Sequence, residues 1–177
     1  MRALLTIVCI GWLATATFGQ AKQYPYLKNG GGIFEVPEAV NIADAKLSYK
    51  VLGEVIKAAD KPDSLNPSLD KLARLLNVHI AAGVPAKNLD MVVVIHFVGT
   101  PIILSDEAHQ KKFGMPNPNT KLINEMAAKG VKFYVCGQSL RARNLVNEAR
   151  NPNIKVVHAA LLALTTFQLK GYALISP

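Results

Sequence analysis

The sequence is poor in cysteine, with only Cys9 and Cys136 among its 177 residues. Cys9 lies inside the apolar segment at the N-terminus, which is predicted to be removed, so Cys136 is the one cysteine of the mature chain. A chain with one thiol cannot form an internal disulfide, and this excludes the small disulfide-stapled domains. Cys136 is therefore buried and inert, paired with another chain, or kept free for chemistry.

Acidic residues are also scarce, because 12 Asp and Glu stand against 20 Lys and Arg and give a formal net charge of +8. A basic excess can indicate nucleic-acid binding, but here the positive residues are spread along the chain. The densest groups are Lys111–Lys112 and Arg141 with Arg143, and neither is interleaved with aromatic residues. A base-stacking surface needs such aromatics, so no nucleic-acid partner is predicted. Half of the residues are apolar, which excludes a disordered chain.

Long uncharged apolar runs are missing after the N-terminus, so no membrane span is predicted in the mature protein. The N-terminus itself has one positive charge at Arg2, an apolar run over Ala3–Leu13, and small residues over Ala14–Gly19. That order is typical of a secretory signal peptide, predicted over residues 1–19. The predicted location is therefore secreted or periplasmic. Three cleavage points fit, after Ala16, Gly19 or Ala21.

Residues 20–45 are irregular and too few for a domain, so they are predicted to be an arm that packs on the body or on a neighbouring subunit. A short strand is possible at Ile33–Val36. The glycines at 30–32 do not indicate a phosphate-binding loop, because no strand precedes them and no helix with a Lys-Ser/Thr pair follows. The remainder, residues 46–177, is predicted to be one domain.

In that domain, segments with the periodicity of strands alternate with segments that have the periodicity of helices. Strands are predicted over residues 45–58, 91–95, 131–135, 154–157 and 171–175. Helices are predicted to start at Asn66-Pro67, Ser105, Asn117-Pro118, Ser139 and Ala159. This alternation with short links predicts a three-layer α/β/α fold, doubly wound around a mostly parallel sheet.

Three of these strands end at side chains that could do chemistry, namely His96, Cys136 and His158. If the strands are parallel, all three lie at the carboxyl edge of the sheet, where ligands bind in such folds. A thiol at a helix N-terminus is shifted towards thiolate, and Arg141 and Arg143 could add to this. His96 could accept the proton.

Other interpretations of these residues remain open. A cysteine after a strand is often a small buried apolar residue, and His158 could simply face solvent or another subunit. The His, His and Cys set contains zinc or copper ligand types, but its spacing is irregular and no carboxylate is evidently placed to orient it, so no metal and no cofactor is predicted. His79 and His109 fall in helices and are predicted to be surface or packing residues.

Four segments resemble one known family: GVKFYVCGQSLRAR, VVVIHF, ILSDEAHQKKFG and the C-terminal LTTFQLKGYALISP. They are similar to the DsrE/DsrF-like family, and most similar to its exported branch, over Lys46 to Pro177. The resemblance implies an α/β sandwich, assembly into trimers or hexamers, and sites near subunit boundaries. It also implies that Cys136 matches a cysteine that carries sulfur as a persulfide in relay members. His96 matches a histidine common at that strand end, whereas His158 stands where a serine is expected.

The leading hypothesis is therefore thiol-based sulfur handling, as a sulfurtransferase or sulfur carrier whose donor and acceptor the sequence does not name. Cys136 would be the nucleophile or persulfide carrier and His96 its proton partner. Four residues are predicted to bind substrate: Gly137, Gln138, Ser139 and Arg141. The alternative is a non-catalytic oligomeric binding module with a structural Cys136, and a His/Cys metal-binding protein comes third.

Overall fold

Five parallel strands form the centre of the protein in a computed structural model that describes residues 20–177. The strands are β1 Tyr49–Val55, β2 Leu89–Ile95, β3 Lys132–Cys136, β4 Ile154–Val157 and β5 Ala173–Ile175. Their order across the sheet is β4-β3-β2-β1-β5, and every neighbouring pair is parallel. The predicted α/β class with a mostly parallel sheet is confirmed.

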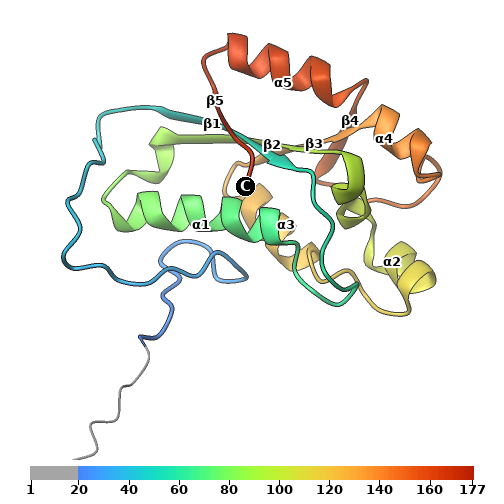
Figure 1. Ribbon diagram of the computed structural model, residues 1–177, viewed down its shortest axis with the longest axis horizontal. Helices are drawn as coiled ribbons and strands as arrows, with labels where there is room; N and C mark the ends of the chain where they lie inside the picture. Colours follow the sequence, from blue (N-terminus) through green and yellow to red (C-terminus); the bar gives the residue numbers. More distant parts are fainter. Residues whose placement is uncertain (1–19) are drawn as a thin grey trace, which may run out of the picture.

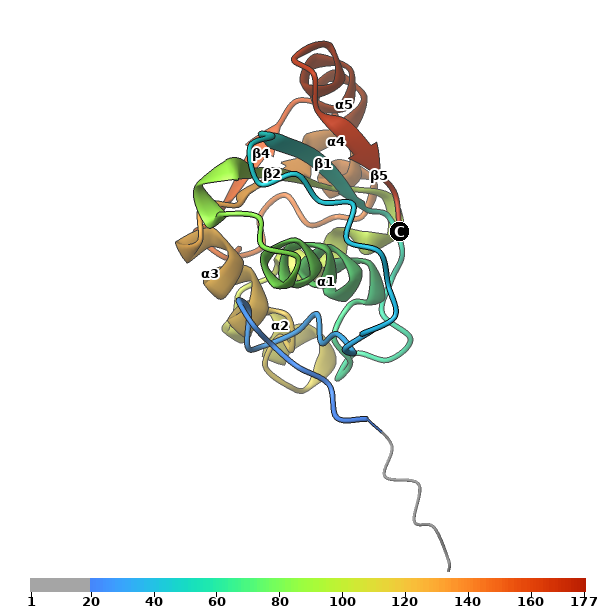
Figure 2. The same ribbon diagram turned by 90° about the vertical axis from the view of Figure 1, so that its left-hand side faces the viewer.

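Helices cover both faces of this sheet, which makes three layers (Figure 1). The helices are α1 Pro67–Ala81, α2 Asp106–Phe113, α3 Thr120–Ala128, α4 Gly137–Ala142 and α5 Ala160–Leu169, with short 3-10 turns η1 Ala86–Asn88 and η2 Phe97–Ile103. Figure 2 shows the sheet between α1 on one side and α5 on the other. The chain runs from β1 to β4 in one direction, and then crosses back over the sheet through α5 to place β5 beside β1.

The apolar run of β2 explains why the sheet can be covered on both faces. Met91, Val93 and Ile95 belong to the cluster on the α1 face, and Val92 and Val94 to the cluster on the α5 face. Every one of these residues is 2% exposed or less. Continuous β-branched sequence is what a parallel strand buried on both faces requires.

Two predicted helix starts are confirmed by their capping bonds. The side chain of Asn66 accepts hydrogen bonds from the N–H groups of Ser68 (3.0 Å) and Leu69 (3.1 Å), with Pro67 at the first helical position. The hydroxyl of Ser105 likewise accepts the N–H of Ala108 at 3.2 Å. These bonds satisfy amide groups that the first turn of a helix leaves free.

The predicted helix start at Asn117-Pro118 is wrong, because α3 begins at Thr120. The side chain of Asn117 joins two segments: its oxygen accepts the N–H of Asn119 at 3.0 Å, and its amide nitrogen donates to the carbonyls of Ile102 (2.8 Å) and Leu104 (2.7 Å). Asn117 is 5% exposed and holds the end of η2 against the start of α3. Local sequence could not separate this long-range role from capping, since both use the same short amide.

The first strand is shorter than the predicted 45–58. It begins at Tyr49, because Asp44 turns the chain beforehand by accepting the N–H of Lys46 at 2.8 Å. It ends at Val55, whose carbonyl accepts the N–H of His96 at 3.0 Å. The predicted short strand at Ile33–Val36 is also absent, and Ile33 forms a single antiparallel bridge with Gln23 instead.

The segment from residue 20 to 33 lies on α1 and α3 of the same chain. Leu27 is fully buried there. The carboxylate of Glu125 on α3 accepts the N–H groups of Lys28 (2.7 Å) and Asn29 (2.9 Å). Asn77 on α1 accepts the N–H of Leu27 at 2.8 Å. One buried and one half-exposed polar side chain, Asn77 and Glu125, therefore hold a segment that has almost no regular structure of its own.

Residues 1–19, over which the signal peptide is predicted, lie outside the described residues, so that prediction stays untested. Over residues 20–177 no helix combines the length and apolar character that crossing a membrane needs.

Candidate functional site

Cys136 is the last residue of β3 and also the N-cap of α4. Its sulfur accepts the N–H of Ser139, in the first turn of α4, at 3.4 Å. It also accepts the N–H of Ala160, the first residue of α5, at 3.2 Å. Amide donors from the starts of two helices thus converge on one sulfur atom, where the positive ends of both helix dipoles favour negative charge.

This setting changes the acidity of the thiol. Burial of Cys136 by itself raises the pKa. Hydrogen bonds from the hydroxyl and the N–H of Ser139 act in the opposite direction, and so do those from the N–H groups of Ala160 and Gln138. The balance leaves the pKa of Cys136 below that of an ordinary cysteine. Hydrogen bonds to the charged form therefore outweigh desolvation here, and the thiolate is favoured.

Gly137 and Gln138 attach α4 to the end of β4. A Cβ atom on Gly137 would lie 3.0 Å from the carbonyl oxygen of Val157 and 3.2 Å from that of His158, so the close approach of the two segments suits glycine. The side-chain amide of Gln138 donates to the carbonyl of His158 at 3.4 Å. The ring of His158 is exposed, so it is the backbone of that residue that takes part.

Ser139 bonds the backbone of Phe97, a residue that was not among the predicted site residues. The Ser139 hydroxyl accepts the N–H of Phe97 at 3.0 Å, while the guanidinium of Arg143 donates to the Phe97 carbonyl and lies 5.7 Å from the ring centre. Phe97 is 63% exposed and has a φ of 52°, in the left-handed region that bulky residues avoid. Strained backbone held by its surroundings is common at functional sites. No sequence pattern indicates this strained conformation of Phe97, because phenylalanine is not a turn residue.

Glu54 is the second residue that the sequence analysis missed. It lies on β1 and is only 8% exposed, and its carboxylate bonds Nε2 of His96 at 2.9 Å. The signal was present in the segment YKVLGEV, where Glu54 is an acid inside an otherwise apolar strand end. The expectation that no carboxylate is placed to orient His96 is therefore wrong.

The predicted site residues come together only in part. Gly137, Gln138 and Ser139 surround the start of α4 beside Cys136, whereas the hydrogen bond of the His96 ring goes to Glu54 and not to the thiol. Arg141 is exposed and lines a separate pocket of about 390 Å³. The other residues of that pocket are Asn144, Val146 and Asn147.

Metal binding finds little support in the part of the chain that the structure describes. Over residues 20–177 there is no group of three or more His, Cys, Asp or Glu side chains that could hold a metal ion. His96, Cys136 and His158 are thus at one edge of the sheet without forming a ligand set.

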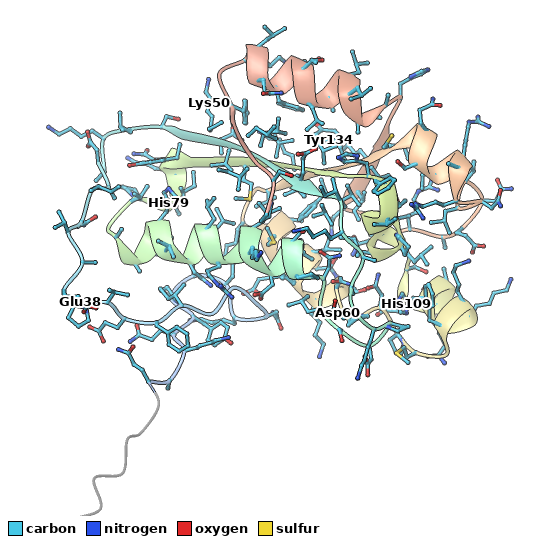
Figure 3. The ribbon with its side chains drawn as sticks, viewed as in Figure 1. Glu38, Lys50, Asp60, His79, His109 and Tyr134 are labelled. Carbon is cyan, nitrogen blue, oxygen red and sulfur yellow. The ribbon has the colours of Figure 1, made fainter. Side chains whose placement is uncertain are left out.

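The other two histidines belong to the packing of helices. His79 bonds the carbonyl of Leu75 at 2.8 Å, and its ring centre lies 4.8 Å from that of Tyr49. His109 is 4% exposed and bonds the carbonyl of Met115 at 2.8 Å. Figure 3 shows them at opposite ends of the molecule, with Tyr134 of β3 lying under α5.

The solved structures that resemble this fold include two of similar length to each other. One is the protein of unknown function MTH1491 from Methanobacterium thermoautotrophicum, with a TM-score of 0.56 and 18% identity over 73% of this chain and 99% of that one. The other is the ychN protein from E. coli, with a TM-score of 0.54, 18% identity and the same two coverages. At this identity the likeness shows the fold alone. No curated protein matches the chain.

A family model gives the remaining comparison. It is described as the DsrE/DsrF-like family and matches residues 39–177, which is most of the chain and begins slightly before Lys46. The matched part contains the whole sheet and the Cys136 turn. The chain belongs to the DsrE/DsrF-like family.

Proposed function

We propose that this protein takes up and passes on sulfur through Cys136, as a persulfide carrier or sulfurtransferase. The observation that carries the proposal is the sulfur atom that accepts N–H groups from two helices and has a lowered pKa. A thiolate is the form of cysteine that attacks sulfur. Membership of the DsrE/DsrF-like family agrees with this chemistry.

The reaction is a transfer of sulfane sulfur that needs no added oxidant. The thiolate of Cys136 attacks the outer sulfur of a persulfide, polysulfide or thiosulfate, and a new S–S bond forms at Sγ. The S–S bond of the donor breaks at the same time, and its electron pair leaves with a thiolate, a shorter polysulfide or sulfite. An acceptor thiolate then attacks the outer sulfur of the persulfide and regenerates Cys136.

Burial limits which donors can reach the sulfur. Cys136 is 4% exposed and packs with Leu52, Val92 and Val94 on the α5 face. A small linear sulfur compound needs less displacement of α5 than a bulky disulfide does. The proposed donors are therefore small, and burial of this kind also motivates the alternative, in which Cys136 is a packing residue of a binding module.

Native protein exposed to thiosulfate or polysulfide is expected to gain about 32 Da for each sulfur atom added at Cys136. Mass spectrometry of the intact chain, followed by peptide mapping, measures this gain. Labelling near neutral pH gives a second measurement, in which the rate at Cys136 is divided by the rate for free cysteine. Because the pKa of Cys136 is lowered and its sulfur is buried, this ratio should be higher for a small alkylating reagent than for a bulky aromatic disulfide. A protein pretreated with the alkylating reagent is the control. Absence of added sulfur, together with labelling no faster than free cysteine, would contradict the proposal.

We also propose that the chain forms a homo-oligomer through the outer side of α5. Leu161, Leu162 and Leu169 are 76%, 60% and 91% exposed, so this helix presents apolar side chains to solvent on the side away from the sheet. Exposed apolar rows of this kind mark interaction surfaces. The proposed partner is a second copy of the chain, because the family resemblance implies assembly into trimers or hexamers.

Replacing Leu161 and Leu162 together by lysine is expected to convert the oligomer to monomer, because each subunit would bury two charges at the contact. Light scattering after size-exclusion chromatography measures the mass. Gln110→Lys adds a charge to an exposed polar position of a different helix, α2, and should leave the mass unchanged. A wild-type chain that is already monomeric would contradict the proposed oligomer.

A further inference from the structure

The carboxylate of Glu54 is in a position where burial is energetically unfavourable. It is 8% exposed within β1, between the buried residues Gly53 and Val55. Carboxylates are almost never buried to this extent without a partner, because losing water costs the charged form several kcal/mol in an apolar setting. The neighbouring strand positions show that an apolar side chain would fit this layer. The carboxylate therefore needs an explanation beyond the fold.

His96 supplies the partner. Its Nε2 lies 2.9 Å from Oε1 of Glu54, and the two side chains are 20% and 11% exposed. A carboxylate only accepts, so Nε2 carries the hydrogen that makes this bond. In the neutral ring the lone pair is then on Nδ1, and the hydrogen bond fixes both tautomer and ring orientation. Glu54 thus prepares His96 to accept a proton at Nδ1.

The register of the sheet places His96 next to Cys136. Ile95 pairs with Val135, so the next residues along the two parallel strands are His96 and Cys136. His96 has extended backbone angles (φ −157°, ψ −177°) and so continues the alternation of β2. Its side chain is on the α5 face, as Val94 and Cys136 are. Neighbouring strands lie about 4.8 Å apart, which leaves a short gap between the two side chains.

We infer that Glu54 is a positioning residue that holds His96 as a proton relay for sulfur transfer at Cys136. The inference rests on the proposed function, since it names a further residue of that site. In the first step the Cys136 thiol gives its proton to Nδ1, and the imidazolium is stabilised by the Glu54 carboxylate. In the second step the thiolate attacks the outer sulfur of the donor, and the leaving group, which is a thiolate, a shorter polysulfide or sulfite, takes that proton from Nδ1. The proton passes from Cys136 to the leaving group, so charge and atoms balance.

The resting structure is consistent with this order of events. The ring bonds Glu54 and not the thiol, and proton-transfer contacts in unliganded enzymes are often long or bridged by one water molecule. A donor sulfur on Sγ would extend about one S–S bond, near 2 Å, beyond the side chain of Cys136. The gap between His96 and Cys136 is where the transferred sulfur and its leaving group would sit.

Other charged groups at this edge have to be considered in a pH profile. The helix α5 carries no titratable side chain over Ala160–Leu169, and β3 contributes Tyr134 on the same face. Lys50 of β1, Asp90 of β2 and Lys132 of β3 are on the same face nearer the starts of their strands, and Tyr172 packs against that face. The titratable groups at the ends of adjacent elements are Lys57, Asp60, Arg141, Arg143, Lys155 and His158. All of these groups are exposed or half-exposed, so solvent screens them more than it screens the Glu54 carboxylate.

The test follows the alkylation rate of Cys136 by iodoacetamide as a function of pH, and the rate of sulfur uptake from thiosulfate. Glu54→Gln keeps the size of the side chain and removes its charge. It is expected to move the midpoint of the alkylation profile upward by about one pH unit and to slow sulfur uptake roughly tenfold or more. Glu54→Asp keeps the charge at a shorter reach and should give an intermediate profile. Glu38→Gln, at an exposed carboxylate of the arm, is the control and should match the wild type.

A double variant separates a relay from a purely structural role. If Glu54 acts through His96, Glu54→Gln should add almost nothing to the loss already caused by His96→Asn. Wild-type profiles for Glu54→Gln and Glu54→Asp, or a full additional loss in the double variant, would overturn the inference. Alkylation needs no sulfur donor. If Glu54→Gln shifts the alkylation profile but the wild type takes up no sulfur, the proposed function alone is contradicted. If the wild type takes up sulfur and Glu54→Gln does not slow the uptake, the proton relay alone is contradicted.

Discussion

Asn77→Ala is expected to lower the free energy of unfolding by about 3 kcal/mol, because it leaves several buried backbone groups without partners. Asn77 is fully buried on α1. Its side-chain oxygen accepts the N–H groups of Tyr26 (3.0 Å) and Leu27 (2.8 Å). Its amide nitrogen donates to the carbonyls of Leu27 (3.3 Å), Gly30 (3.3 Å) and Gly31 (2.9 Å). Alanine supplies none of these bonds and adds a cavity.

Urea unfolding followed by circular dichroism measures this loss, and limited trypsin digestion at Lys28 reports release of the segment 20–33. Asn41→Ala is the matched control, since Asn41 is exposed and both bonds of its side chain are exposed: it donates to the carbonyl of Ala82 at 3.0 Å and accepts the N–H of Ala43 at 3.0 Å. That variant should stay within about 0.5 kcal/mol of the wild type. Equal stability losses for the two variants would show that Asn77 does not hold the N-terminal segment.

The same asparagine shows which part of the fold the sequence could predict. The capping residues Asn66 and Ser105 bond N–H groups two or three positions ahead, so a local pattern was sufficient to identify them. Asn77 and Asn117 bond segments that are distant in the sequence, and their local surroundings look like any helix or turn. The strand order could not be derived either, because the return of β5 to β1 depends on α5 covering the opposite face.

The candidate site likewise contains residues that the sequence could predict and residues that it could not. Cys136 was predicted from its place between a strand and a helix, and the donors that bond its sulfur include Ser139, three positions ahead. The second donor, Ala160, comes from a crossover that no local pattern reveals. Glu54 was overlooked because an acid near a strand end usually faces water, and only the pairing of β1 with β2 brings it to His96. The strained backbone of Phe97 likewise depends on hydrogen bonds with Ser139 of α4 and with Arg143 just after it, which are distant in the sequence.

Cys136→Ser is expected to abolish sulfur uptake while the protein remains folded. The hydroxyl of serine can accept the N–H groups of Ser139 and Ala160 that the sulfur accepts now, so the starts of α4 and α5 keep their acceptor. We expect a cost of about 1 kcal/mol or less in the free energy of unfolding. The hydroxyl is not ionised near neutral pH and cannot form a persulfide, so mass spectrometry after exposure to polysulfide should detect no sulfur at this position.

Cys136→Ala separates the packing role from the chemical one. Alanine leaves both N–H groups without an acceptor in a buried place, so it should cost more than serine, about 1–3 kcal/mol, and should take up no sulfur either. If Cys136 is only a packing residue, the two variants will differ in stability and the wild type will take up no more sulfur than they do. If it is the carrier, stability falls from wild type to serine to alanine, whereas sulfur uptake falls to background at the first substitution. Because the two properties respond differently to the same pair of variants, a thermal unfolding curve and a mass spectrum together decide between the hypotheses.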